Sequence, residues 1–411
     1  MGSRFRLGDL CEFHRGASVP RARMSSDGDL IYIHYGDLYK GFSVKIDVEN
    51  PQNSLPFISR QEKIRQHQWL EDQDIVYVLT SETIDDLGHS FLFNNPEQRP
   101  AVAGTETTIV RVVRRDLLLP AYLNYAMHSP RFCALLRQYA KGMKVFRVHP
   151  DDVSRIEIEV PGLIEQQAVV GIMDALYEKE MLNNRLNDYL AELLDVLFVD
   201  MLNDADASWE RLSLLDIASY KNGLAMQKFR PAPGDPGLPV LKIKELGQGV
   251  CTPDSERCAS TIDESVKIHD GNLVFSWSGT LLLDFWAGGD AGLNQHLFKV
   301  TSDRYPSWLY YLWTKHHMDR FIMLAKDRAT TMGHIKRSAL AESEVLIPPV
   351  EQLEVLTRRM QPIVDELVVN KIQSRNLAGL RDVLLPKLMS GEIDVSNVRL
   401  SMPPNNHLYA G

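Results

Sequence analysis

Two segments of the chain carry basic side chains with few matching acids, and their chemistry is that of phosphate binding. No acidic residue lies between Asp116 and Asp151, and the segment has five net positive charges from Arg131, Arg137, Lys141, Lys144 and Arg147. The segment 304–337 has seven basic residues against two acids, again five net charges. Phosphate attraction to such side chains supplies much of the affinity for nucleic acid. One cluster alone favours a solvated surface, but two at matching places indicate nucleic-acid contact.

Candidate DNA-contacting residues follow from residue type and from position beside expected strand ends. In the first half we choose Thr80, Ser81, Glu82, Thr83, Lys141, Lys144 and Arg147. In the second half we choose Ser276, Ser278, Lys326, Arg328, His334, Lys336 and Arg337. Arginine and lysine can bond guanine or phosphate, and Glu82 could accept a bond from a cytosine amino group. The alternative role for Glu82 is to cap a helix ahead of Asp85 and Asp86.

Motifs for catalysis or metal binding are missing from the sequence. It has no Walker phosphate loop, no Gly-x-Ser-x-Gly elbow, no His-Glu-x-x-His helix and no Asn/Asp-Pro-Pro-aromatic run. Cys251 and Cys258 lack a second ligand pair at metal spacing, so we expect structural thiols. His316 and His317 are interpreted as basic surface. We therefore expect no catalytic residue, metal or cofactor in this chain.

The two basic segments belong to two halves that repeat one order of elements. Leu7–Gly16 lines up with Leu214–Gly223 in its apolar and acidic positions and its final turn glycine. The apolar runs at 74–77 and 272–275 are typical of buried strands. Pro120 and Pro306 each open an expected helix, because proline is favoured in a first helical turn. The repeat predicts two globular units of one fold.

The repeat is closest where each half ends. Four positions in each half share the spacings five, five and three: Val148, Val153, Ile158 and Pro161, then Ile335, Leu340, Val345 and Pro348. Glu-Gln and a long helical pattern follow each proline. The predicted order is globular unit, helix, globular unit, helix.

Both long helical segments have apolar residues spaced by three and four, which is typical of a coiled coil. The first expected seam is Val169, Ile172, Leu176, Lys179, Asn183, Leu186, Leu190, Leu193 and Leu197; the second is Leu353, Leu356, Met360, Ile363, Leu367, Asn370, Ser374, Leu377, Arg381, Leu384 and Leu388. Asn183 and Asn370 hold equivalent positions, and a buried seam asparagine sets register at a cost in stability. We expect the helices to pair; separate helices, each on its own domain, are the alternative.

Length and composition are those of a folded protein of several domains. The 411 residues correspond to about two to four domains, and 44% hydrophobic and 24% charged residues are near the globular average. Four scattered cysteines and an N-terminus without an apolar core indicate the cytoplasm. No apolar run approaches the ~20 residues of a membrane span. The net charge of −9 combines basic globular units with an acidic first helix.

A globular unit followed by proline, Glu-Gln and a long helix, all repeated once, resembles the specificity subunit of type I restriction–modification systems. The resemblance covers almost the whole chain and is carried by Ile156–Pro161 with Glu165–Gln167, by Val345–Pro349 with Glu351–Gln352, and by Leu380–Ile393. The last segment looks like the distal conserved block of that family. Gly162 stands where a second proline would be expected, and Arg381 stands where a seam leucine would be expected.

This resemblance implies a non-catalytic subunit that recognises double-stranded DNA. Its two target-recognition domains would each read half of a split sequence, and two helical regions, paired antiparallel, would set the spacing. Two methyltransferase subunits would bind the chain and methylate adenine with S-adenosylmethionine. Restriction subunits could join them, with ATP and Mg²⁺ expected in these partner subunits.

We therefore expect an α+β protein with two α/β target-recognition domains in pseudo-two-fold repeat, separated by two long helices that form an antiparallel coiled coil. The expected boundaries are 1–160 for the first domain, 161–205 for the first helical region, 206–348 for the second domain, 349–395 for the second helical region and 396–411 for a flexible tail. No membrane contact is expected.

Two other functions remain open from the sequence. A two-headed adaptor could grip other proteins through its basic faces, and the salt dependence of DNA binding would distinguish it. A self-sufficient methyltransferase would need a cofactor site that the sequence does not show.

Overall fold

The computed structural model describes residues 2–39, 42–50, 54–84, 86–326, 335–396 and 398. It divides into two compact units: unit 1 is Met1–Leu176 with Leu380–Gly411, and unit 2 is Tyr177–Gly379. Each unit therefore combines one globular half with a stretch of each long helix. The expected tail after residue 396 lies outside the described residues, except for residue 398.

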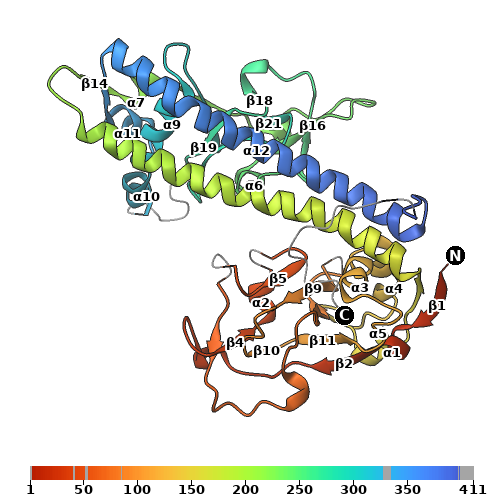
Figure 1. The fold of residues 1–411 in the computed structure, drawn as a ribbon. Helices are drawn as coiled ribbons and strands as arrows, with labels where there is room; N and C mark the ends of the chain where they lie inside the picture. Colours follow the sequence, from red (N-terminus) through yellow and green to blue (C-terminus); the bar gives the residue numbers. More distant parts are fainter. Residues whose placement is uncertain are drawn as a thin grey trace. The chain divides into compact units, whose positions relative to one another are not determined.

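Two sheets form the globular half of unit 1 (Figure 1). The five-stranded sheet runs β2 (Cys11–Arg15), β11 (Thr107–Val112), β7 (Ile75–Val78), β9 (His89–Asn94) and β5 (Lys45–Asp47); the four-stranded sheet runs β10 (Ala101–Ala103), β4 (Leu30–Ile33), β6 (Phe57–Ile58) and β3 (Met24–Ser25). All four residues of the central strand β7 are buried, as expected for a strand covered on both faces. Both sheets are mixed, since β4 pairs with β10 and β5 with β9 in parallel.

Short helices and two-stranded ladders complete unit 1. They are β1 (Ser3–Arg6), α1 (Leu7–Leu10), α2 (Tyr35–Leu38), β8 (Thr80–Ser81), α3 (Pro120–Met127), α4 (Pro130–Arg137), β12 (Phe146–Arg147), α5 (Pro150–Ser154) and β13 (Glu157–Val160), with 3₁₀ turns at Arg21–Arg23 and Gln66–Gln68. Sequence explains the helix starts: the Ser129 hydroxyl accepts the Phe132 N–H at 3.3 Å and Pro130 takes the first position of α4.

Unit 2 contains a second pair of sheets. One runs β15 (Ser219–Asn222), β22 (Leu297–Thr301), β19 (Leu273–Ser276) and β20 (Leu283–Phe285); the other runs β17 (Arg257–Cys258), β16 (Leu238–Leu241), β21 (Ala291–Leu293) and β18 (Lys267–Ile268). The remaining elements are β14 (Glu210–Ser213), α7 (Leu214–Ile217), α8 (Ile243–Gln248), α9 (Ser307–His316), α10 (Met318–Lys326), α11 (Arg337–Ala341) and β23 (Glu344–Ile347), with 3₁₀ turns at Met226–Lys228 and Glu264–Val266.

The internal topology of the two globular halves repeats, as the sequence predicts. The order β2-β11-β7-β9 in unit 1 corresponds to β15-β22-β19-β20 in unit 2. Both halves also close with an antiparallel ladder between their first and last strands, β1 with β13 and β14 with β23. One expectation shifts by a residue: Pro120 is the first residue of α3, but Pro306 precedes α9 as its cap.

The two long helices are α6 (Leu163–Asn203) and α12 (Val350–Ser390), which lie side by side in Figure 1. Asn183 contacts Gln373, and Asn187 contacts Asn370 and Leu367. Because the residue numbers rise along α6 while they fall along α12, the pair is antiparallel, and the predicted coiled coil is confirmed. Among the described residues, no helix is long and apolar enough to cross a membrane.

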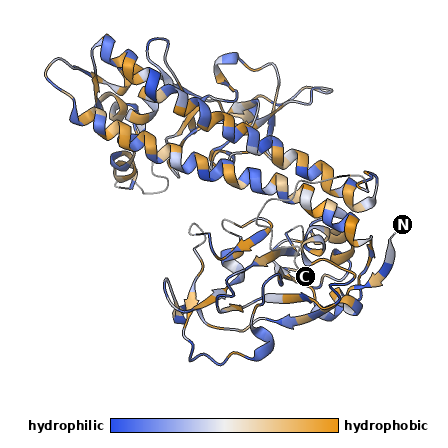
Figure 2. Ribbon diagram, in the orientation of Figure 1, coloured by the Kyte–Doolittle hydropathy of each residue, from blue (hydrophilic) through white to orange (hydrophobic). Residues whose placement is uncertain are grey.

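The expected seam of α6 is partly wrong. Leu186 and Leu193 are 37% and 44% exposed, whereas Leu194 is fully buried. The reason is that this stretch of α6 also packs on the globular half of unit 2. Its buried face is therefore wider than the seam between two helices, and it is rotated about the helix axis away from the expected face. In Figure 2 hydrophobic and hydrophilic residues both recur along α6 and α12.

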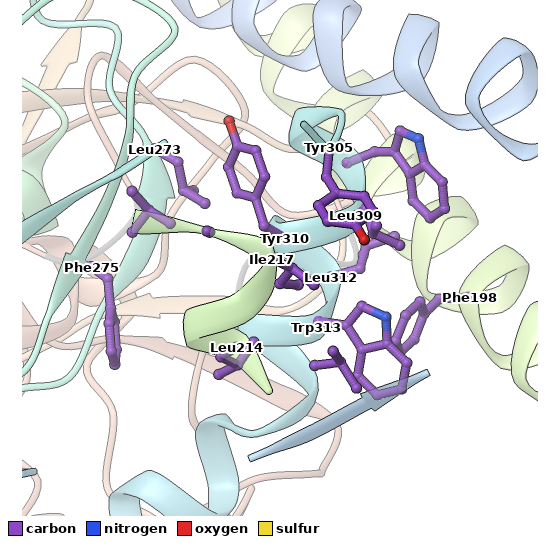
Figure 3. Close-up of a cluster of buried hydrophobic side chains, with 14 of the residues drawn as sticks. Phe198, Leu214, Ile217, Leu273, Phe275, Tyr305, Leu309, Tyr310, Leu312 and Trp313 are labelled. Atoms are coloured by element: carbon purple, nitrogen blue, oxygen red, sulfur yellow. The ribbon is translucent and has the colours of Figure 1, made fainter. Parts of the chain in front are cut away.

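One hydrophobic core joins both long helices to the globular half of unit 2 (Figure 3). Phe198 of α6 packs edge-on against Trp313 of α9, with ring centroids 5.1 Å apart. Met360 and Val364 of α12 belong to the same buried cluster. The helices therefore pair with each other and both cover the globular half of unit 2, so the predicted pairing is observed and the alternative, separate helices each on its own domain, is not.

Polar contacts fasten the helices to their domains. In unit 1, the Asp174 carboxylate of α6 accepts the Tyr125 hydroxyl at 2.6 Å and pairs with Lys45 at 2.8 Å. In unit 2, Arg375 of α12 donates to both oxygens of Asp270 at 2.7 and 3.0 Å, and Lys371, one turn away, pairs with Asp284. Such forked arginine–carboxylate bonds are geometrically specific.

Candidate nucleic-acid interface

In unit 1 the structure brings the chosen basic and hydroxyl residues together on one small ladder. Strand β8 pairs antiparallel with β12, which places Ser81 opposite Phe146 and Thr80 opposite Arg147. Lys141 and Arg147 exchange two backbone hydrogen bonds of 2.9 and 2.8 Å. Residues 141–147 thus form a hairpin that projects from the end of the central strand β7.

The tip of this hairpin is exposed and basic. Lys141 and Arg147 side chains are 82% and 60% exposed, and Lys144 is also exposed. Met143 is 96% exposed, an unusual position for a large apolar side chain. Gly142 has φ +123°, and a Cβ there would lie 2.0 Å from the Val145 carbonyl oxygen, so the turn requires glycine.

Asp152 lies 3.6 Å from Lys141 of this hairpin, and a second acid, Glu106, faces it from the side of Arg147; the sequence analysis missed Glu106. Its carboxylate accepts the Thr80 hydroxyl at 2.6 Å and lies 3.8 Å from the Arg147 guanidinium. Glu106 also has φ +57°, a left-handed conformation that is rare outside glycine. No local sequence signal marks this residue, because its contacts come from strands distant in the chain.

Glu82 and Thr83 lie in an irregular turn after β8. The Ser81 hydroxyl accepts the Thr83 N–H at 3.2 Å, and the Thr83 hydroxyl accepts the Asp86 N–H at 3.3 Å. No helix follows in the described part of this segment, so the capping role considered for Glu82 is wrong. The Glu82 side chain is exposed.

The second half has the same backbone connection at the same place. In unit 1 the Val148 N–H donates to the Leu79 carbonyl at 3.0 Å, and in unit 2 the Ile335 N–H donates to the Trp277 carbonyl at 3.1 Å. Both bonds fix a basic segment beside the end of the central strand, β7 or β19. The unit 2 segment that corresponds to the hairpin includes Arg328 and His334, which lie outside the described residues.

Two of the chosen residues in unit 2 are buried. Ser276 is fully buried and its hydroxyl donates to the Thr280 carbonyl at 2.8 Å, while Ser278 is only 4% exposed. The Ser276 hydroxyl stabilises the turn after β19, and neither side chain is open to solvent. We therefore remove Ser276 and Ser278 from the candidate interface.

The basic residues at the two ends of the undescribed segment are exposed. Lys326 ends α10, Lys336 caps α11 and Arg337 begins α11. Other basic residues counted in the sequence are engaged within the unit: Lys315 pairs with Asp195 at 2.6 Å and Arg320 with Glu342 at 3.4 Å. The net charge of the segment therefore overstates the charge that faces solvent.

The paired histidines at the end of α9, His316 and His317, are not both basic surface. The His317 ring donates to the Glu344 carbonyl at 2.9 Å, and burial lowers its pKa, which favours the neutral form. The thiols of Cys11 and Cys251 are also shielded, since burial raises the pKa of each to about 12. Such thiols are unreactive at neutral pH.

The two seam asparagines are buried inside unit 2. Asn183 is fully buried and Asn370 is 3% exposed. Asn183 donates to Gln373, and Asn370 donates to Asn187, over 2.9 and 3.0 Å. Together these four residues form a polar layer within the helix pair.

Comparison with known proteins identifies one family. Residues 3–192 match the type I restriction modification DNA specificity domain. The MjaIX specificity subunit of Methanocaldococcus jannaschii is 23% identical over 317 residues, which are 70% of this chain and 72% of that protein. The EcoBI specificity subunit of Escherichia coli is 20% identical over 215 residues, which are 50% of this chain and 44% of that protein.

The fold is also similar to a solved structure, the specificity subunit of a type I restriction–modification system from M. genitalium. The TM-score is 0.56 at 14% identity, over 94% of this chain and 95% of that one. With the domain match over residues 3–192 and the named relatives, this chain is similar to specificity subunits of type I restriction–modification systems and shares the fold of the solved one.

Proposed function

We propose that this chain recognises an asymmetric, interrupted DNA sequence, with one part read by residues 1–160 and the other by residues 206–348. The observation that carries this proposal is the backbone bond shared by the two halves, Val148 to Leu79 and Ile335 to Trp277. It holds a basic segment beside the central strand end in each. Two such surfaces in one chain suit a target of two half-sites.

Within each surface the side chains differ in role. Lys141, Lys144 and Arg147 in the first domain, and Lys326, Lys336 and Arg337 in the second, are suited to phosphates and guanine edges. Thr80, Ser81 and Glu82 are short acceptors and donors suited to base edges. Glu106 would hold Arg147 and Thr80 in place for that contact, given its bonds to both.

Methylome mapping tests the proposal directly. Cells that express this chain with its methyltransferase should acquire a two-part adenine-methylation motif that cells lacking the chain do not have. Lys141→Gln, Lys144→Gln and Arg147→Gln together should reduce methylation at every site by weakening the first half-site. An unchanged methylome on removal of the chain would reject the proposal and favour the adaptor.

Recognition of two half-sites by two domains also gives the helix pair a role as the spacer that sets the gap between the half-sites. One heptad inserted in both helices at the unit boundary, after residues 176 and 379, adds ~10 Å of helix. The gap between half-sites should lengthen by ~3 base pairs with both half-sites unchanged, and two heptads should lengthen it by ~6. A gap that stays constant in both insertions would reject the spacer role.

An exposed apolar stripe on α6 supports a docking place for a methyltransferase subunit. Leu182, Leu186, Tyr189, Leu193 and Val196 are spaced by four, three, four and three residues and are 37–60% exposed. The exposed acid Glu192 flanks the stripe, while Asp195 is already paired with Lys315. A partner helix with an apolar seam and basic flanks would complement it.

Co-purification tests this docking surface. Leu186→Lys with Leu193→Lys should release the methyltransferase from the chain while the thermal unfolding of the chain stays close to that of the parent. Asn184→Lys with Asn203→Lys, on exposed positions of the same helix, adds the same two charges and is the matched control. Equal methyltransferase binding in the stripe variant and the control would place the partner elsewhere.

The adaptor alternative differs in its salt response. If the chain holds DNA through several phosphates, the logarithm of the binding constant should fall linearly with the logarithm of the salt concentration, with a slope of about −0.9 for each phosphate. A protein-binding adaptor would show no such slope with DNA. Recognition of chromosomal DNA would place the chain in the cytoplasm.

A further inference from the structure

A polar groove in unit 1 carries cations that the DNA-contact residues chosen above do not include. It lies between residues 15–19, which begin at the last residue of β2, and residues 59–68, which follow β6. Arg15, Arg23, Lys63 and Arg65 line it. Glu62 is the acid among the lining residues, and both its oxygens accept from Arg23, at 3.3 and 3.2 Å. Four cations against one acid leave the groove with three net positive charges.

Arg15, Lys63 and Arg65 are the cations that remain for a ligand. All three side chains are exposed, and no described carboxylate lies within ion-pair distance of any of them. Like charges that converge in one groove repel each other, so their arrangement costs free energy in the isolated chain. An anionic partner that spans the groove would offset that cost.

Hydrogen bonds of the buried Tyr32 hydroxyl connect the wall of the groove to the turn beside the basic hairpin. The Tyr32 hydroxyl, fully buried, donates to the Ala17 carbonyl at 2.6 Å and accepts the Val19 N–H at 3.0 Å, so it holds the groove wall. It also accepts the Thr105 N–H at 2.9 Å. Thr105 precedes Glu106, the residue that binds Thr80 and lies beside Arg147.

Strand pairing places the groove wall and the hairpin at the same end of the five-stranded sheet. The Gly16 N–H donates to the Thr107 carbonyl at 2.9 Å, and a Cβ at Gly16 would lie 2.1 Å from the Gly104 carbonyl oxygen. The wall is therefore pressed against the turn that precedes β11. The groove, this turn and the hairpin lie along one edge of the unit.

We infer that this groove binds the phosphate backbone of the DNA whose bases face the hairpin, with Arg15, Lys63 and Arg65 as the phosphate ligands. The inference rests on the proposed DNA recognition and adds a second, sequence-independent contact to the first domain. Three exposed cations without an ion-pair partner among the described residues favour phosphates over base edges, because base reading needs side chains held in place.

The test compares two triple variants of the full chain in complex with its methyltransferase. The groove variant carries Arg15→Gln, Lys63→Gln and Arg65→Gln. The matched control carries Arg4→Gln, Arg6→Gln and Arg115→Gln, which removes three exposed cations of unit 1 outside the groove. The affinity for a duplex with the mapped target and for a scrambled duplex of equal length is measured over a range of salt.

We expect the groove variant to lose affinity by on the order of 100-fold at 0.15 M salt, equally on both duplexes, with a log–log salt slope smaller by about 2.7. The control should change little. If the groove variant binds both duplexes as tightly as the control variant, the inference is overturned. This includes the case in which only its assembly with the methyltransferase weakens, which would indicate that the groove binds an acidic protein surface. A loss confined to the target duplex would assign the groove to base reading and also overturn it.

The hairpin variant Lys141→Gln, Lys144→Gln and Arg147→Gln separates this result from the proposed function. If the hairpin variant loses affinity and the groove variant matches the control, the inference fails while DNA recognition by the first domain stands. If neither variant loses affinity, DNA recognition by this edge of unit 1 fails as well.

Discussion

The side-chain amide of Asn183 donates to Gln373 on the facing helix over 2.9 Å, and not to Asn370, its equivalent in the repeat. Asn370 donates instead to Asn187, one turn further along α6. The antiparallel arrangement therefore offsets the two seam asparagines by one turn. The Asn183 side-chain oxygen is buried and has no hydrogen-bond partner among the described residues.

Asn183→Leu should stabilise unit 2, because it removes a buried polar group with an unpaired oxygen and leaves Gln373 exposed to water. We expect the free energy of unfolding to rise by about 1 kcal/mol, which corresponds to a rise of about 2–4 °C in the thermal unfolding midpoint. Calorimetry of the full chain measures it. Asn184→Leu, on the exposed side of the same turn, is the control and should leave the midpoint unchanged. A lower midpoint for Asn183→Leu would mean that the polar layer is net stabilising.

Asp174→Asn should destabilise unit 1. Asp174 is 4% exposed and pairs with Lys45, whose side chain is 10% exposed, so the change removes a carboxylate from beside a buried ammonium. Loss of one partner of a buried pair costs about 3–5 kcal/mol. The asparagine keeps an oxygen for the Tyr125 hydroxyl, which limits the effect to the charge. Denaturant unfolding monitored by fluorescence gives the difference.

Two further variants locate that loss in the ion pair. Lys45→Met combined with Asp174→Asn should recover most of the lost stability, because a buried pair can be replaced by apolar and neutral groups at little cost. Glu192→Gln, an exposed acid of the same helix, should be neutral. A double variant as unstable as Asp174→Asn would assign the effect to packing.

His128 should make unit 1 less stable in mild acid. Burial lowers its pKa to about 4, whereas an unfolded histidine has a pKa near 6.5. Between these values the unfolded chain binds a proton that the folded chain does not. Stability is therefore full above pH 6.5 and falls as the pH drops toward 4.

His128→Gln should remove about 2 kcal/mol of the stability change between pH 7.5 and pH 5. Glutamine can still donate to the Ser90 carbonyl, which the His128 ring contacts at 2.8 Å. Chemical denaturation at the two pH values measures the difference. His67→Gln, an exposed histidine of unit 1, should keep the parental pH dependence. An identical pH dependence in His128→Gln and the parent would contradict the prediction.

The sequence predicts the architecture well because the repeat is a pattern of spacing. Positions such as Ile158 and Val345 recur because they lie in the antiparallel ladder that closes each half. The end of the central strand is also predictable, since Ile75–Val78 is uniformly apolar and the polar residues begin at Thr80. The pairing of β8 with β12 then brings the chosen basic residues beside it.

The residues that the sequence misplaces are those with contacts from distant segments. Gln166 and Gln352 follow equivalent prolines, yet Gln166 is fully buried and accepts the Leu119 N–H, while Gln352 is exposed. The burial of Ser276 could not be predicted from the sequence either, since a serine at the end of a strand is suited to an exposed turn and to a buried turn alike. Charge counts fail for a similar reason, because the partner of Lys315 lies on another helix.

Gly142→Ala tests whether the shape of the hairpin matters for DNA binding. An added Cβ would lie 2.0 Å from the Val145 carbonyl oxygen, at a φ of +123° that alanine rarely adopts. The turn must therefore open, which displaces Met143 and Lys144 while all charges are kept. A strain of about 1–3 kcal/mol is expected.

We expect Gly142→Ala to weaken binding to the mapped target by about 10-fold, because the shape of the hairpin changes. The loss on scrambled DNA should be smaller, because the charge of the hairpin is unchanged. Gly162→Ala is the control, because no atom lies within 4 Å of the added Cβ there. Fluorescence anisotropy with both duplexes gives the affinities, and circular dichroism verifies that both variants are folded. If Gly142→Ala binds the target as tightly as Gly162→Ala, the hairpin acts only through its charge. In that case base reading in the first domain must come from the segment Thr80–Thr83 alone.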